Sequence, residues 1–130
     1  MKKCVRYLLV ATLVLFTAAA EARSATCPPA EMIKAARFTK ALAYDPQINL
    51  WEFISVPFMH EGVIWNVAYG MELPGVADPT LAIKRGQSAY EHARLVITSP
   101  EPDPIPGHLF CDYTVSGMDY WIQALSPPGE

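Results

Sequence analysis

The sequence has few residues of the kinds that build catalytic and cofactor sites, and it has none of their compact motifs. Only three histidines and three cysteines occur among 130 residues, and they form neither an HExxH nor a CxxC pattern. No serine lies in a GxSxG sequence, and no glycine-rich phosphate loop is present. These absences exclude the common zinc motifs, the nucleophile elbow of serine hydrolases and the P-loop as explanations of function.

Long apolar runs are also absent, except at the N-terminus. Three basic residues within the first six positions precede an uncharged run over residues 7–20, which ends at Ala20 and is followed by Glu21 and the small residue Ala22. This pattern predicts a secretory signal peptide over 1–22, cleaved after Ala22, with cleavage after Ala20 as the alternative. The run of 14 residues is shorter than the roughly 20 that a spanning helix needs. We therefore expect no transmembrane span after cleavage.

Basic residues are too few to favour a nucleic-acid partner. Removal of 1–22 leaves 108 residues over 23–130, which is enough for a single domain. Seven Lys and Arg residues and twelve Asp and Glu residues remain, so the net charge is −5. An acidic domain repels phosphate backbones, so nucleic acid is not an expected partner. Export predicts a periplasmic or secreted location.

Cysteine is scarce enough to restrict its pairing. Cys4 lies in the predicted signal peptide, so Cys27 and Cys111 are the only cysteines of the mature chain. In an oxidising compartment these two are expected to form one disulfide, which closes a loop of about 85 residues. The alternative is that the two thiols are used separately.

Apolar periodicity predicts one N-terminal helix followed by strands. Residues 29–43 place their apolar side chains on one face of an amphipathic helix, which Asp45-Pro46 would end. Segments 50–59 and 63–73 are rich in aromatic and branched residues and flank a hairpin turn at 60–62. Pro57 lacks an amide hydrogen, so the first of these strands should lie at an edge or carry a bulge. Residues 109–116 alternate as a half-buried strand, and 120–125 form the last strand.

Two segments are ambiguous. Residues 80–98 are predicted as a short helix or turn at 80–85 and a strand over 88–98, because Gly86 weakens a continuous helix. Proline at every second position predicts an extended, polyproline-like connection over 100–107. The order of elements predicts an α+β fold, in which an N-terminal amphipathic helix packs on an antiparallel sheet of about four to five strands and is tied to it by the disulfide.

Aromatic residues are concentrated in the predicted sheet and give the clearest indication of binding. The candidate binding residues are Trp51, Trp65, Tyr69 and Trp121. On an exposed face they would form a platform for a sugar, a peptide or a protein partner. The alternative is that they fill the core under the helix.

The sequence therefore favours an exported, non-enzymatic binding protein of unidentified partner. A small periplasmic enzyme, metal-dependent or hydrolytic, is an alternative that rests on the pairs His60-Glu61 and Glu91-His92. A structural protein of the cell envelope is a third interpretation. No catalytic residue, metal ligand or cofactor is assigned, and the oligomeric state is left open.

The cysteines and their neighbours also carry a family resemblance. Cys27-Pro28-Pro29 precedes the predicted helix, and Phe110-Cys111-Asp112-Tyr113 lies in a late strand. The chain resembles small secreted bacterial proteins, grouped as domains of unknown function, which have an early C-P and a late C-x-Y after a signal peptide. This resemblance implies an exported protein of a Gram-negative bacterium with one disulfide, and it implies no catalytic residues.

Overall fold

The computed structural model describes residues 25–93, 102–114 and 121–130. The predicted signal peptide, the last part of the strand expected over 88–98 and the end of the strand expected over 109–116 lie outside these ranges. The described elements, in chain order, are α2 (Ala30–Lys34), β1 (Phe38–Asp45), the 3-10 helix η1 (Pro46–Ile48), β2 (Leu50–Ser55), β3 (Phe58–His60), β4 (Val63–Glu72), α3 (Pro79–His92), β5 (Asp103–Ile105), β6 (His108–Tyr113) and β7 (Trp121–Ser126).

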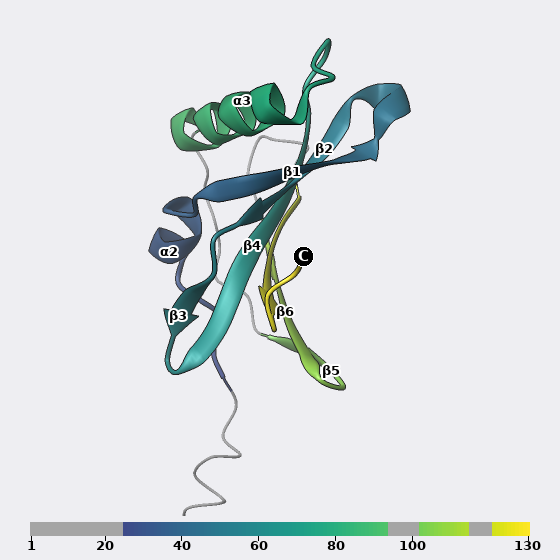
Figure 1. Ribbon diagram of the computed structural model, residues 1–130. Coiled ribbons are helices and arrows are strands. Elements are labelled where there is room, and N and C mark those ends of the chain that lie inside the picture. Colours follow the sequence, from purple (N-terminus) through teal and green to yellow (C-terminus); the bar gives the residue numbers. More distant parts are fainter. Residues whose placement is uncertain (1–24, 94–101, 115–120) are drawn as a thin grey trace, which may run out of the picture.

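The strands form an antiparallel sheet in the order β1-β2-β4-β7-β6-β5, and β3 pairs with the beginning of β4. In Figure 1, α3 lies beside β1 at one end of the sheet, and the hairpin of β5 and β6 lies at the other end. The disulfide joins Cys27, just before α2, to Cys111 in β6. The α+β prediction, the antiparallel sheet and the disulfide are all confirmed.

The core lies between one face of the sheet, which we call the helix-covered face, and the helices that pack on it, α3 and the short α2 with its fully buried Ile33. Phe38, Phe53, Tyr69 and Tyr90 form a continuous aromatic cluster there, with ring centroids 4.7–6.3 Å apart. The Tyr69 hydroxyl donates a 2.5 Å hydrogen bond to the Gly86 carbonyl of α3. The cluster therefore joins β1, β2, β4 and α3 through apolar contact and satisfies a buried hydroxyl at the same time.

The predicted helix over 29–43 is mostly wrong. Only Ala30–Lys34 are helical, and the chain is extended as β1 from Phe38 onward. Pairing with β2 places Phe38 and Ala41 in the core, where they are 5% and 9% exposed. Tertiary pairing thus overrides a helical pattern composed largely of alanine. Asp45 ends β1, and its carboxylate accepts a hydrogen bond from the Gln47 amide at the start of η1.

The predicted strand over 50–59 is interrupted near Pro57, as its missing amide hydrogen indicated. Beta2 ends at Ser55 and β3 begins at Phe58. The Ser55 hydroxyl accepts a 2.7 Å hydrogen bond from the Val67 amide of β4, which replaces a backbone partner at the break. The turn after β3 has positive φ at Glu61 and Gly62, +50° and +78°, as expected for a type I′ hairpin. The predicted hairpin is therefore confirmed.

Helix α3 corrects the prediction for 80–92. It runs without interruption from Pro79 to His92, and its N-cap Asp78 accepts a hydrogen bond from the Leu81 amide. The strand expected from residue 88 is wrong for the part of it that the structure describes. Gly86 does not break the helix; it faces the Phe53 ring at close range. Within the proline-rich segment 100–107, predicted as an extended connection, Asp103–Ile105 are extended and pair with β6 as the edge strand β5.

Buried tyrosines make the stability of the fold sensitive to alkaline pH. Burial is the main cause that raises the pKa of the Tyr90 phenol above its ordinary value of about 10, and the nearby Tyr113 adds to it. Burial also raises the pKa of Tyr113, whose hydroxyl donates to the Pro28 carbonyl at 2.6 Å.

We expect the free energy of unfolding to fall as the pH rises above about 10, because the unfolded chain then loses phenolic protons that the folded chain retains. Urea titrations between about pH 8 and 11 would measure this free energy. It should be constant with respect to the tyrosines below the pKa of tyrosine in the unfolded chain and should decline above it. Tyr90→Phe and Tyr113→Phe should each reduce this slope. An unchanged slope in the double variant would contradict the assignment.

Candidate functional site

The structure separates the four predicted binding aromatics into core and surface. Trp51, Trp65 and Tyr69 are 4%, 0% and 1% exposed and belong to the helix-covered face. Trp121, at the start of β7, is half-buried on the opposite face. We call this opposite side the open face, because no helix in the described ranges covers it. Trp121 is therefore the accessible member of the predicted set.

The Trp121 indole lies flat on β4 over Gly70. A Cβ atom at residue 70 would stand only 2.0–2.2 Å from three atoms of the six-membered part of the indole. The ring therefore occupies the space that any other side chain would fill, which is why this central strand has glycine here. Gly70 positions the indole, and β7 supplies it.

Tyr44 of β1 completes the site, and sequence analysis missed it. Its ring lies 5.4 Å from that of Trp121 at an interplanar angle of 58°, and the residue is 64% exposed. We call this pair of tilted rings the aromatic corner. Tyr44 follows a segment predicted as helical, so its place on the sheet was hidden. The β-forming residues Phe38, Thr39 and Tyr44 were the available signal.

Carboxylates from neighbouring strands surround the aromatic corner. Glu52 of β2 lies directly opposite Gly70, which in turn lies opposite Trp121, so all three side-chain positions are in one row of the open face. Glu72 is two residues beyond Gly70 on β4 and is exposed, so it lies on the same face.

The next row of the open face has mixed charge. It contains Lys40, which lies opposite Ile54, and Gln123, which donates a 2.6 Å hydrogen bond to the exposed Asp112. Lys40 is the basic residue that shares this part of the face. The corner therefore has apolar ring surface at its centre and carboxylates beside it.

The C-terminal tail is attached to the open face at Asn66, four residues before Gly70 along β4. Buried Asn66 donates to the Gly129 carbonyl at 2.7 Å and accepts from the Gly129 amide at 2.8 Å. This double hydrogen bond satisfies a polar side chain that is 1% exposed. The tail thus divides the aromatic corner from the other end of the face.

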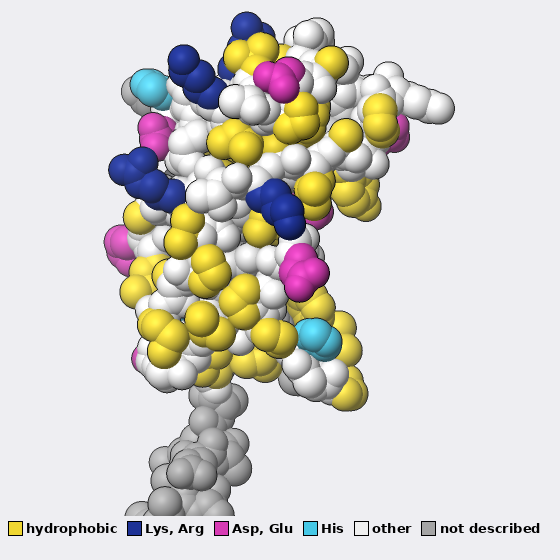
Figure 2. Space-filling view, viewed as in Figure 1, with side chains coloured by type: hydrophobic (Ala, Val, Ile, Leu, Met, Phe, Trp, Pro, Cys, Tyr) yellow, Lys and Arg dark blue, Asp and Glu magenta, His cyan; other side chains and the backbone are white. Residues whose placement is uncertain are grey.

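That other end is apolar and shallow. A groove of about 420 Å³ lies between the β5–β6 hairpin, the start of β4 and the end of β7, lined by Ile64, Ile105, Gly107, His108, Leu109, Ser126 and Pro127. Figure 2 shows hydrophobic side chains gathered over this lower part of the molecule, whereas the Lys and Arg side chains visible in that view lie in its upper half.

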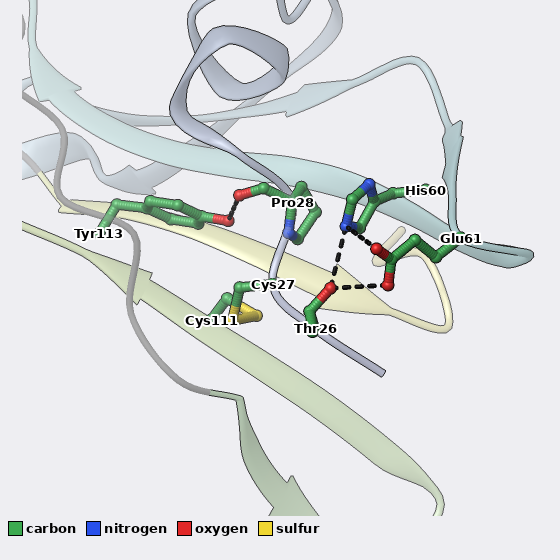
Figure 3. Close-up of a disulfide and its surroundings, with 7 residues drawn as sticks. All are labelled: Thr26, Cys27, Pro28, His60, Glu61, Cys111 and Tyr113. Atoms are coloured by element: carbon green, nitrogen blue, oxygen red, sulfur yellow. Dashed lines mark hydrogen bonds and ion pairs between the residues drawn. A yellow bond between two sulfur atoms is a disulfide. The ribbon is translucent and has the colours of Figure 1, made fainter. Parts of the chain in front are cut away.

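The pair His60-Glu61 forms a polar cluster with Thr26 (Figure 3). The Thr26 hydroxyl donates to the Glu61 carboxylate at 2.8 Å and lies 3.2 Å from His60 Nε2, while Nε2 and Glu61 Oε1 are 3.9 Å apart. A nucleophile, base and acid relay would place the carboxylate on Nδ1, away from the hydroxyl. Here all three groups meet at one point, so the cluster fixes the segment that leads to Cys27.

The second histidine pair is separate. His92 Nδ1 lies 2.7 Å from the Ser88 carbonyl one turn earlier in α3, and Glu91 accepts from Gln87. Helix α3 and the β3–β4 turn lie at different ends of the molecule in Figure 1. Across residues 25–93, 102–114 and 121–130, no three His, Cys, Asp or Glu side chains are grouped so that they could hold a metal ion.

None of the helices in the described ranges is both long enough and apolar enough to cross a membrane. Comparison with protein-family models, curated proteins and solved structures finds no match for the chain. The site is therefore interpreted from its own chemistry. The aromatic corner and the shallow groove both combine exposed apolar surface with a defined shape, and the corner has carboxylates from neighbouring strands beside it.

Proposed function

We propose that this protein is an exported, non-enzymatic binding protein that holds its ligand at the aromatic corner of the open face. The observation that carries the proposal is the Tyr44–Trp121 pair, in which a highly exposed phenol and an indole seated on Gly70 form a two-sided aromatic surface. Aromatic rings supply large contact area at a small cost in conformational entropy. Binding, rather than chemistry, is what such a surface does.

The disulfide-bonded domain is consistent with an oxidising compartment outside the cytoplasm. We place the protein in the periplasm or beyond it, after removal of the signal peptide. Kinship with small single-disulfide proteins exported by Gram-negative bacteria is part of this proposal, and the C-P and C-x-Y sequences around Cys27 and Cys111 support it.

The proposal is tested with protein exported and processed from the full sequence by a bacterial host. Two-dimensional amide NMR spectra would be recorded against single probes of three kinds: arginine amide, cellotriose and a short apolar peptide. We expect at least one probe to shift the amide signals of residues 42–44, 52, 70 and 121. The proposal would be overturned if the probes shift only the signals of other regions, or if no probe shifts any signal.

Two variants and one control sharpen the test. Tyr44→Ala should weaken binding of the probe about tenfold, because one of the two rings of the corner is lost. Gly70→Ala should displace the indole from the sheet, because the new Cβ atom takes its place. Tryptophan emission should then shift to longer wavelength, and binding of the same probe should weaken. Met59→Ala is the matched control, since Met59 is 57% exposed at the far end of the molecule. Equal loss in the control would count against a site at the corner.

A further inference from the structure

The charge around the aromatic corner indicates what it binds, and this inference rests on the proposed function. We propose that the corner takes a lysine or arginine side chain presented by an extended segment of a protein partner. The tilted rings of Tyr44 and Trp121 would contact the cation, and the carboxylates of Glu52 and Glu72 would lie beside it. Each part of this arrangement follows from a separate observation.

The aromatic pair fits a cation. The indole lies with one face against Gly70, so its other face is turned away from the sheet. The faces of indole and phenol rings carry negative electrostatic potential, and a guanidinium or ammonium group placed over them is attracted. Two rings tilted by 58° with centroids 5.4 Å apart offer such a group two faces at once.

The charge balance selects a cation over an anion. Among the described residues, four acids, Asp45, Glu52, Glu72 and Asp112, belong to the strands and rows that surround the corner, against one base, Lys40. Asp45 is partly engaged as the cap of η1, and Asp112 accepts from Gln123, which leaves Glu52 and Glu72 closest to the ring pair in register. The net charge of −5 expected for the processed chain acts in the same direction at long range.

The outer edge of β1 near Tyr44 indicates an extended segment rather than a small amine. Strand β1 is the terminal strand of the sheet and pairs only with β2 among the described strands. At its start the Phe38 amide donates to Gln87 Oε1 of α3, so the edge proposed for a partner lies toward Leu42 and Tyr44. Thr39, Lys40, Leu42, Ala43 and Tyr44 are all exposed along it. A peptide added to this edge would place alternate side chains on the open face next to Leu42 and Tyr44. The opposite edge strand, β5, has three residues and contains Pro104, so it is a poorer template.

The test uses isothermal titration with two matched peptides. Each is a blocked heptapeptide of alternating threonine and valine whose central residue is either arginine or its uncharged analogue citrulline. We expect the arginine peptide to bind about tenfold more tightly than the citrulline peptide. Glu52→Gln should remove most of this difference, whereas Glu31→Gln on α2 makes the same chemical change away from the corner and should leave it intact.

The outcomes separate this inference from the function on which it rests. If both peptides bind equally and Tyr44→Ala abolishes both, the preference for a cation is wrong, but the binding site at the corner is supported. Free arginine amide binding as tightly as the arginine heptapeptide would overturn the extended segment. Preference for cellotriose at the corner would also overturn the inference and keep the proposed function. Failure of every probe to perturb the corner would overturn both.

Discussion

Reduction of the Cys27–Cys111 disulfide is expected to lower the free energy of unfolding by about 4–5 kcal/mol. The two cysteines are 84 residues apart in sequence, so the bond closes most of the domain into one loop. The chain-entropy view attributes the stabilisation to the restricted unfolded state, and long loops give large effects. Because small domains are stable by only about 5–15 kcal/mol, this bond would account for a large share of the total.

The structure shows what the disulfide holds in place. Cys111 is fully buried in β6, and the segment before α2 is attached to the sheet through Cys27 (Figure 3). Next to the disulfide, the carbonyl of buried Pro28 accepts a hydrogen bond from the Tyr113 hydroxyl. The same segment is also held by the Thr26 hydroxyl, which donates to Glu61, and by Ile33 of α2, which is fully buried, so the disulfide adds a covalent link to these contacts.

Urea unfolding of the exported protein with and without reductant measures the effect directly. Cys111→Ser should reproduce the loss, with a further cost from a hydroxyl in a buried position. The double variant Cys27→Ala/Cys111→Ala is the control, since its stability should not respond to reductant. Identical unfolding midpoints for the oxidised and reduced wild-type protein would contradict the expectation.

The parts of the fold that sequence analysis predicted correctly are those fixed by local chemistry. The strand at 63–72, the hairpin turn at Glu61-Gly62 and the break near Pro57 follow from alternation, turn residues and a missing amide hydrogen. The disulfide followed from counting cysteines. Each of these inferences depends on residues within a short window or on composition, so no knowledge of the tertiary structure was required.

The errors occurred where distant contacts decide the local structure. The segment 38–45 has Thr39, Leu42 and Ala43 at helical spacing, yet its pairing with β2 and the burial of Phe38 make it a strand. Tyr44 was missed as a site residue for the same reason, because its neighbour Trp121 is 77 positions away and the two meet only through the strand order β1-β2-β4-β7. Among the predicted binding residues, the burial of Trp51 likewise depends on a tertiary contact, since its indole N–H donates to the Val76 carbonyl 25 positions away.

Gly86 was predicted to interrupt a helix, but its role is to let α3 pack closely on Phe53. Its replacement is therefore the second change for which we expect a large effect on stability. Replacing glycine by alanine inside a helix normally stabilises it by about 1 kcal/mol. Here we expect Gly86→Ala to destabilise the protein by about 1–3 kcal/mol, as overpacking of a core does. The sign of the change is therefore opposite to that at an ordinary helical position.

The reason is the contact between α3 and β2. A Cβ atom on residue 86 would stand 2.4 Å from Phe53 Cζ and 2.5 Å from its Cε1. The Phe53 ring has little freedom to move away, because it is fully buried and stacks on Tyr69 at 4.8 Å. Tyr69 in turn donates its hydroxyl hydrogen bond to the Gly86 carbonyl, so a shift of the helix would disturb this bond as well.

Urea denaturation followed by circular dichroism would measure the change, with Ser88→Ala as the control. Ser88 is exposed on the same helix, and its replacement should stabilise the protein by a few tenths of a kcal/mol at most. Phe53→Leu removes ring atoms that the new methyl group would meet, so it should cost less stability in the Gly86→Ala background than in the wild type. A stabilising Gly86→Ala, or equal costs of Phe53→Leu in both backgrounds, would show that α3 does not pack on Phe53 at this distance.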